Sequence, residues 1–207
     1  MSKENSLAFE YIGVQRPFKK IQNRWDQCAN IWSIHLFESE RSLASAALAI
    51  EPYILALPPE ANILEIAAGS NNSIYYPENF NMSRVTAVDA SPEMMQLNPS
   101  GHKIIADVRK RLEFPSSSFS LALCMFGMRY LENQEEVLEN MHRVVIPEQW
   151  VVCIDYYNAW HDDAVRVFDI NQLSKFASNL QVQQVVANHL IPVSKEIAQL
   201  DFLALQK

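Results

Sequence analysis

Glycine is scarce in this chain, which contains only 4 glycines among its 207 residues. At the usual frequency of about 7%, a chain of this length would contain about 14. A dinucleotide-binding turn needs the pattern G-x-G-x-x-G, and a P-loop needs Gly-Lys followed by Ser or Thr. Neither pattern occurs in the sequence. The sequence therefore gives little support to a glycine-rich loop that cradles phosphate groups.

Cysteine is also rare, since the chain contains only the 3 residues Cys28, Cys124 and Cys153. This odd and widely spaced set excludes a disulfide framework. It also lacks the CxxC or CxxH spacing that is typical of zinc sites. We therefore predict neither structural disulfides nor a metal site.

Positive charge is in the minority, because 17 Lys and Arg residues face 24 Asp and Glu residues, for a formal net charge of −7. Domains that bind nucleic acid commonly present a basic surface. A nucleic-acid partner is therefore not expected. The 49% hydrophobic and 20% charged fractions are typical of a globular protein and exclude an intrinsically disordered one.

Long hydrophobic runs are absent as well. The longest mostly apolar run, residues 43–57, contains Glu51 and Pro52 and is shorter than the ~20 residues that span a bilayer. The first residues are polar and charged, without the apolar segment of a signal peptide. These features predict a soluble, cytoplasmic protein with no membrane contact.

The chain divides near Pro58 and Pro59 into two parts with different patterns. Apolar residues between positions 18 and 32 recur at steps of three and four, which predicts an amphipathic helix. An alanine- and leucine-rich stretch from 39 to 56 predicts a second helix, in which Pro52 is expected to cause a break or a kink. Two such helices cannot bury their apolar faces alone. We therefore predict a helical extension or cap over residues 1–57, packed on a domain over residues 58–207.

After Pro59, short apolar runs typical of buried strands alternate with helical stretches. The runs cover residues 62–67, 84–89, 102–106, 120–125 and 150–155, with helices beginning near Pro92 and covering 134–145 and 170–180. This alternation favours a parallel sheet with helices on its faces. Residues 181–190 and 198–206 follow one another without a helix between them, which predicts an antiparallel pair at the sheet edge. The predicted fold class is α/β.

Small and acidic residues follow the first three predicted strands. Ligands of open α/β sheets bind at the carboxyl ends of the strands. The first strand runs into a turn that contains Gly69, and Asp89 ends the second strand, where a carboxylate can accept both hydroxyls of a ribose. Asp107 follows the third strand and could accept a hydrogen bond from the amine of adenine. This constellation predicts a nucleoside site.

Four segments in this order resemble the motifs of class I S-adenosylmethionine-dependent methyltransferases, over about residues 60–207. Residues 64–70 resemble the first motif, an acid followed by a glycine-rich turn, and residues 85–95 resemble the second. Residues 106–120 resemble the third motif region, and residues 141–147 resemble the helix end and loop that usually read Arg-Val-Leu-Lys-Pro-Gly-Gly. The resemblance implies a Rossmann-like, seven-stranded, mostly parallel sheet with an antiparallel last strand.

The resemblance also implies S-adenosyl-L-methionine as the cofactor and assigns roles around it. Glu65 and Gly69 would line its methionine end, and Asp89 would hold the ribose hydroxyls. Asp107, with the residue after it, would sit at the adenine, and Phe126 would lie beside the sulfonium. The implied cofactor-binding set is Glu65, Ala67, Gly69, Asp89, Ala90, Asp107, Val108 and Phe126.

Two residues of the first turn depart from the family pattern. Ala67 replaces the usual first glycine, and Asn71 replaces the last one. Asparagine adopts left-handed backbone conformations more readily than most residues. Two outcomes therefore stay open: Asn71 preserves the turn, or its side chain crowds the methionine end of the cofactor.

Methyl transfer requires mainly that nucleophile and methyl group are aligned, with a base where the acceptor is a hydroxyl or a protonated amine. His161 and Tyr156, which follow the fifth strand, are the candidate catalytic residues. Arg129 and Tyr130 follow the fourth strand and belong to the same edge of the sheet.

The predicted function is methyl transfer to a small-molecule acceptor by in-line displacement. No large insertion follows the fifth strand and no RNA-binding module is added, which favours a compact acceptor. Trp25 or Trp32 on the first helix is expected to line the acceptor pocket. Two alternatives stay open, namely an inactive binding or scaffold protein and a non-methylating enzyme that uses the same pocket. The patterns specify neither the acceptor nor an oligomeric state.

Overall fold

The protein is described by a computed structural model over residues 17–35, 40–156, 166–190 and 200–207. Its α-helices are α1 (Phe18–His35), α2 (Glu40–Leu55), α3 (Pro92–Leu97), α4 (Gln134–Val144) and α5 (Ile170–Ala177). Its strands are β1 (Ile63–Ile66), β2 (Val85–Asp89), β3 (His102–Ile105), β4 (Phe119–Met125), β5 (Val145–Tyr156), β6 (Gln184–Leu190) and β7 (Leu200–Gln206). No helix in these ranges combines the length and the apolar character that a membrane span requires.

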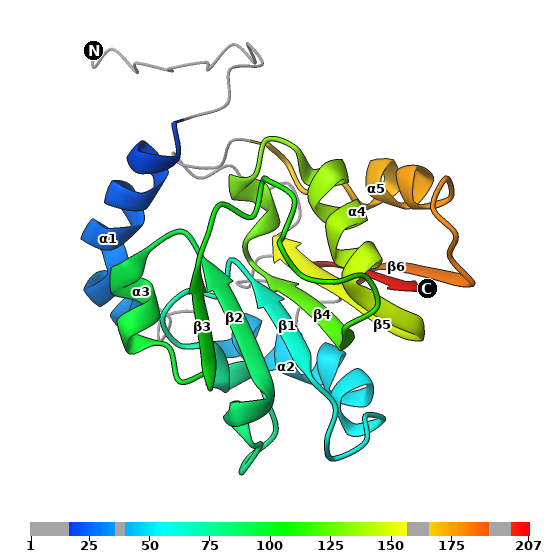
Figure 1. Cartoon of the computed structure of the whole chain (residues 1–207), viewed down its shortest axis with the longest axis horizontal. Coiled ribbons are helices and arrows are strands. Elements are labelled where there is room, and N and C mark those ends of the chain that lie inside the picture. The colour runs from blue at the N-terminus through cyan, green and yellow to red at the C-terminus, as the bar shows by residue number, and fades with distance from the viewer. Residues whose placement is uncertain (1–16, 36–39, 157–165, 191–199) are drawn as a thin grey trace.

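The seven strands form one sheet in the order β3-β2-β1-β4-β5-β7-β6 (Figure 1). Strands β1 to β5 pair in parallel, whereas β7 runs antiparallel to both of its neighbours, β5 and β6. The strand order reverses beside β1, because the chain first builds β1 to β3 on one side and then β4 on the other. The predicted fold class is therefore confirmed, including the antiparallel pair formed by the last two strands.

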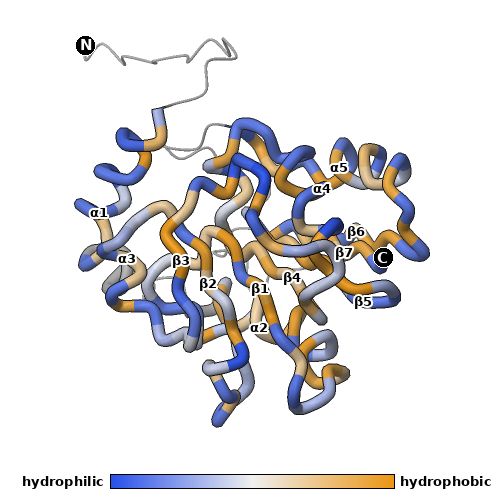
Figure 2. Tube along the Cα trace, viewed as in Figure 1, coloured by the Kyte–Doolittle hydropathy of each residue, from blue (hydrophilic) through white to orange (hydrophobic). Residues whose placement is uncertain are grey.

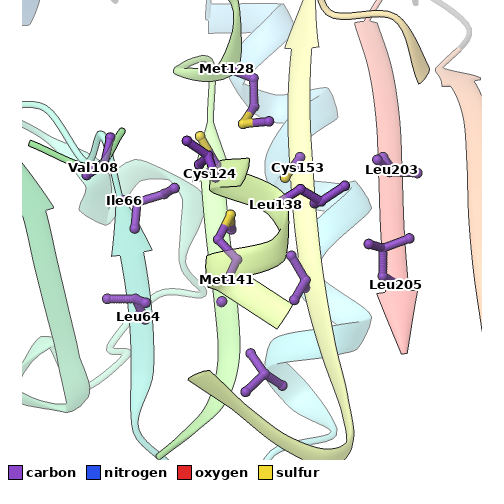
Figure 3. Close-up of a cluster of buried hydrophobic side chains, with 14 of the residues drawn as sticks. Leu64, Ile66, Val108, Cys124, Met128, Leu138, Met141, Cys153, Leu203 and Leu205 are labelled. Atoms are coloured by element: carbon purple, nitrogen blue, oxygen red, sulfur yellow. The ribbon is translucent and has the colours of Figure 1, made fainter. Parts of the chain in front are cut away.

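Each face of the sheet has its own hydrophobic core, because side chains alternate along every strand. On one face, α4 covers a cluster that includes Leu64 and Cys124, and Met141 packs on it from the helix (Figure 3). On the other face, α2 contributes Ile50 to a cluster with Ile63 and other strand residues. The tube of Figure 2 shows the central strands β1, β4 and β5 as the most hydrophobic part of the fold. Burying each such aliphatic side chain stabilises the fold by about 1.5–3 kcal/mol.

Helix α2 continues through Pro52 to Leu55, so the expected break is wrong. Proline lacks the N–H that would bond to the carbonyl four residues earlier, which belongs to Leu48. Leu48 lies on the outer side of the helix with its side chain 68% exposed, where water can bind that carbonyl. Ile50 and Ile54 are buried on either side of the proline and hold the helix against the sheet.

Strand β5 begins directly after α4 and is longer than the predicted run of residues 150–155. Its added residues are irregular, since Phe119 pairs with Val145 and the next pair is Leu121 with Trp150. The N–H of Glu148 donates to the carbonyl of Lys207 at 2.7 Å. The end of the chain therefore supplies hydrogen-bond partners that the local sequence does not reveal.

Candidate functional site

A cavity of about 320 Å³ opens at the carboxyl ends of β1, β2, β4 and β5. Its walls are the turns that follow β1, β3 and β4, the last residues of β2 and β5, and side chains from α1, α2 and α3. This place, beside the reversal of strand order, is where open α/β sheets bind ligands. The volume is at the lower end of the range for small-molecule sites.

The turn after β1 brings backbone to the cavity wall. Ala67 and Gly69 both have left-handed backbone, with φ of 49° and 61°. Asn71 has φ of −143°, so it does not preserve the turn by supplying a left-handed residue. Ala67 does so instead, which costs about 1–2 kcal/mol for a residue with a Cβ. The turn is held by Asn98, whose side-chain amide donates to the carbonyl of Gly69 at 2.8 Å.

Asp89 at the end of β2 links this turn to the next one. Its Oδ2 accepts from the N–H of Gly69 and its Oδ1 from the N–H of Ser91, both at 2.9 Å. Burial raises the pKa of Asp89, and the backbone donors oppose this rise. Ser91, whose hydroxyl accepts from the N–H of Met94 at 3.1 Å, is the N-cap residue of α3. Asp89 thus orders two turns and still lines the cavity.

Helix α1 closes the cavity through contacts that the sequence did not indicate. The side-chain amide of Gln22 donates to the carbonyl of Ala90 at 3.1 Å. The carboxylate of Asp26 accepts from the hydroxyl of Ser91 at 2.6 Å. Trp25, between them on the helix, lines the cavity and packs edge-on against Tyr130 with ring centroids 4.8 Å apart. Trp25 is one of the two tryptophans predicted to lie at the pocket, whereas nothing in the sequence points to Gln22 or Asp26.

Asp107 lines the cavity together with Val108, but its carboxylate also forms an ion pair. Arg109 Nε donates to Oδ1 and Nη2 to Oδ2, both at 2.8 Å, and the N–H of Arg109 donates to Oδ1 at 3.2 Å. Burial favours a higher pKa, but the hydrogen bonds and charge of Arg109 outweigh it and lower the pKa of Asp107. Glu132 holds the same guanidinium at 3.2 Å. Two acids therefore fix Arg109, which is 7% exposed.

Glu65 does not line the cavity, contrary to the place that the resemblance implied for it. Its side chain lies on the α2 face of β1, beneath the short helix Asn72–Tyr75. Oε2 accepts from the amide of Asn72 at 2.7 Å and from the hydroxyl of Tyr76 at 2.9 Å, and the side chain is buried. Burial raises the pKa of Glu65 to about 8. Glu65 therefore holds Asn72 and Tyr76, which follow the turn at the cavity wall, without lining the cavity itself.

The remaining predicted residues divide according to whether the structure describes them. Residues brought together at the cavity are Ala67, Gly69, Asp89, Ala90, Asp107, Val108, Phe126 and Tyr156. His161 lies outside the described residues, as does the side chain of Trp32. Within the described part of the chain, no three His, Cys, Asp or Glu side chains are grouped as a metal site would need.

Comparison with known proteins identifies the domain that carries this cavity. Residues 64–153 match the sequence profile of a methyltransferase domain. The demethylmenaquinone methyltransferase of Listeria welshimeri is 25% identical over 152 residues, which cover 69% of this chain and 61% of that protein. The enzyme of the same name from Chlamydia muridarum is 26% identical over 103 residues, which cover 46% of this chain and 44% of that protein. The chain thus spans less than two thirds of the length of these relatives.

Solved structures share the fold at lower identity. A methyltransferase of Thermotoga maritima, described as a possible histamine N-methyltransferase, superposes with a TM-score of 0.65 at 14% identity, covering 89% of this chain and 99% of that one. The 1,6-didemethyltoxoflavin-N1-methyltransferase of Burkholderia thailandensis, solved with its acceptor and S-adenosylhomocysteine, gives a TM-score of 0.65 at 17% identity, covering 94% and 92%. The profile match over residues 64–153 and the shared fold both support the resemblance to class I S-adenosylmethionine-dependent methyltransferases.

Proposed function

We propose that the protein transfers a methyl group from S-adenosyl-L-methionine to a small-molecule acceptor by in-line displacement. The carrying observation is the buried carboxylate of Asp89, which accepts from the N–H of Gly69 at 2.9 Å on the wall of the cavity. When bound, the cofactor supplies an activated methyl group on sulfur, so the protein contributes mainly alignment.

The residues present fit this cofactor. Each oxygen of the Asp89 carboxylate accepts from a backbone N–H, that of Gly69 or of Ser91, and Asp89 also lines the cavity, where ribose hydroxyls can donate to it. The left-handed turn at Ala67 and Gly69 brings main chain to the cavity, as an amino-acid moiety requires. Asp107 lines the cavity and is the proposed acceptor for the adenine amine, and the hydrogen bonds and charge of Arg109 lower its pKa. Phe126, with φ of 59°, also lies on the wall of the cavity, and we propose that it lies beside the sulfonium.

The acceptor half of the cavity supports a compact substrate. Beyond Phe126 the wall is formed by aromatic side chains from β5, from the turn after β4 and from α1. The relatives are named for methylation of demethylmenaquinone, and the Burkholderia enzyme was solved with 1,6-didemethyltoxoflavin. We propose an acceptor of this size. Tyr156 is the described candidate for contact with its reacting group, while the catalytic role of His161 stays a prediction.

We also propose that residues 1–57 act as a cap on a methyltransferase domain formed by residues 58–207. The contacts of Gln22 and Asp26 with the turn after β2 support this proposal, because they attach α1 to the wall of the cavity beside Asp89. The cytoplasmic location stays a prediction.

Calorimetric titration of the purified protein with S-adenosylmethionine and with S-adenosylhomocysteine tests the proposed function. We expect saturable binding of both, and release of S-adenosylhomocysteine when an acceptor from a small-molecule panel is added. Absence of binding by a folded sample would overturn the proposal and favour the inactive binding or scaffold protein. Binding of both ligands without turnover on any acceptor would favour a non-methylating use of the pocket.

A further inference from the structure

The acceptor half of the cavity contains a buried cation. Arg129 lies in the short turn after β4, lines the cavity and is only 3% exposed. Its guanidinium carbon lies 4.9 Å from the ring centroid of Tyr130 and 4.6 Å from that of Tyr156. The two rings hold the guanidinium by cation–π contacts. The guanidinium brings a planar cationic group to this wall, beside the carboxylate of Asp155.

The hydrogen-bonding capacity of Arg129 is only partly met by the protein, since its guanidinium contacts the side chain of Tyr130 and pairs with Asp155. Its Nε and Nη1 are buried without a hydrogen-bond partner. The nearest anion is Asp155, whose Oδ1 lies 3.4 Å from Nη1. This distance exceeds the roughly 2.7–2.9 Å of a charge-assisted hydrogen bond. A buried donor without an acceptor is costly, so the site is better satisfied when an oxygen is brought to it.

Asp155 is already engaged elsewhere. Its Oδ2 accepts from the backbone N–H of Arg129 at 3.0 Å, and its Oδ1 from the N–H of Tyr156 at 2.8 Å. Its strand partner is Asp201, a second buried acid that His189 contacts at 2.6 Å between Nδ1 and Oδ1. Asp155 therefore fixes the turn that carries Arg129 and leaves part of the guanidinium's capacity unused.

The surroundings of Arg129 restrict the shape of a partner. Phe126 packs on Tyr156 with ring centroids 5.0 Å apart, and Tyr75 packs on Phe126 at 6.0 Å. Such walls favour flat, apolar ligands.

We propose that the methyl acceptor is a small planar molecule with an anionic oxygen, carboxylate or ionised hydroxyl, that binds to Arg129. This inference rests on the proposed function, because it names the acceptor class of the same cavity. Arg129 is assigned to binding the acceptor and setting its orientation, not to proton transfer.

A matched pair of probes tests the assignment, namely 2-naphthoate and its neutral isostere 2-naphthamide. Both are titrated into the protein saturated with S-adenosylhomocysteine and, separately, into the protein alone. We expect 2-naphthoate to bind about tenfold or more tightly than 2-naphthamide, as a hydrogen bond to a charged group implies. Arg129→Gln should remove this preference, and Arg129→Lys should keep only part of it because lysine lacks the planar fork.

Arg143→Gln is the matched control. Arg143 also has a buried Nε without a partner, but it does not line the cavity, and its other nitrogens donate to the carbonyls of Phe114 and Leu112. Its variant should keep the preference for 2-naphthoate. Urea unfolding establishes that each variant is folded, and Arg129→Lys replaces Arg129→Gln if the latter is not.

The outcomes separate the two proposals. The inference is overturned if the wild type binds the two probes equally. It is also overturned if the preference survives in both Arg129 variants or disappears in Arg143→Gln. The proposed function stands in each of these cases as long as the protein binds S-adenosylhomocysteine. No binding of S-adenosylhomocysteine, combined with an Arg129-dependent preference for 2-naphthoate, overturns the proposed function and keeps an anion site at Arg129.

Discussion

The methyl group of Ala67 occupies the space that a side chain at Gly127 would need. A Cβ added to Gly127 would lie 2.6 Å from the Cβ of Ala67 and 3.1 Å from the Sγ of Cys124. Gly127 has φ of −106°, which any residue can adopt, so its small size rather than its flexibility is required here. The chain thus places glycine after β4, opposite the position where the family's first turn usually has one.

This relationship predicts coupling between the two positions. Gly127→Ala should destabilise the protein by roughly 1–3 kcal/mol, the usual cost of overpacking. Ala67→Gly in the same chain should recover much of this loss, because it removes the opposing methyl group. Urea unfolding of the two single variants and the double variant measures the coupling. Strictly additive effects would show that the two groups do not compete for space.

Ala67→Gly alone should be close to neutral or stabilising. It relieves about 1–2 kcal/mol of left-handed strain but adds roughly 0.5–1 kcal/mol of chain entropy to the unfolded state. Ala68→Gly is the control, because Ala68 is the next residue of the same turn and does not have positive φ. It should only destabilise. A larger loss at Ala67 than at Ala68 would contradict the strain at Ala67.

Asp89 is expected to recognise the ribose rather than only to order the turns. Asp89→Ala should weaken binding of S-adenosylhomocysteine by roughly 1–3 kcal/mol. The wild type should discriminate against the 2′-deoxy analogue, whereas the variant should bind both ligands alike. Calorimetry measures both effects.

Asp169→Ala controls for loss of a backbone-binding carboxylate, because Asp169 accepts from the N–H groups of Asn171 and Gln172 at the start of α5. It should leave both affinities unchanged. Discrimination that persists in Asp89→Ala would assign the ribose hydroxyls to another group.

The Asp107–Arg109 pair predicts a preference for an amino group on the base. A carboxylate offers about four lone-pair positions, and Arg109 uses three of them. The remaining position suits one N–H of adenine and repels the carbonyl of hypoxanthine. S-adenosylhomocysteine should therefore bind more tightly than S-inosylhomocysteine, and Arg109→Met should reduce the ratio because Asp107 loses its fixed orientation. Competition calorimetry measures the ratio, and equal affinities in the wild type would exclude this role of Asp107.

Glu65 should make the protein less stable as pH rises. Its pKa of about 8 in the folded protein lies above the ordinary value of 4.5. Between these values the folded state holds a proton that the unfolded chain has released, so stability falls as pH rises and levels off above about 8. Glu65→Gln should remove this slope while its amide oxygen still accepts from Asn72 and Tyr76.

Urea unfolding at about pH 5 and about pH 9 tests the effect of Glu65. The wild type should lose roughly 4 kcal/mol more than Glu65→Gln across this range. Glu60→Gln, at an exposed acid before β1, is the control and should follow the wild type. Parallel pH profiles of wild type and Glu65→Gln would show that Glu65 is ionised throughout.

Local pattern carried the prediction of the strands and of several cavity residues. Buried runs and their ends are properties of short segments, and strand ends of a parallel sheet meet at one edge. Gly69 and Asp89 could therefore be expected beside each other from their positions alone. The same reasoning placed Asp107, Phe126 and Tyr156 at that edge.

Partners that come from distant segments could not be predicted in this way. Gln22 and Asp26 reach the turn after β2 only because α1 packs beside α3. Pro52 stays within α2 because the sheet holds its neighbours Ile50 and Ile54.

The sequence by itself determined the α/β order of elements, the strand ends and the motifs of the family, because these depend on spacing along the chain. Only the tertiary structure decided which side chains line the cavity and which of their hydrogen-bonding groups are already paired within the protein. In the folded protein, Glu65 does not line the cavity and Asp107 forms an ion pair with Arg109. Arg129 is buried, and two of its nitrogens have no hydrogen-bond acceptor. The physical reason is that hydrogen-bond partners, burial and close packing are set by the elements that meet in space.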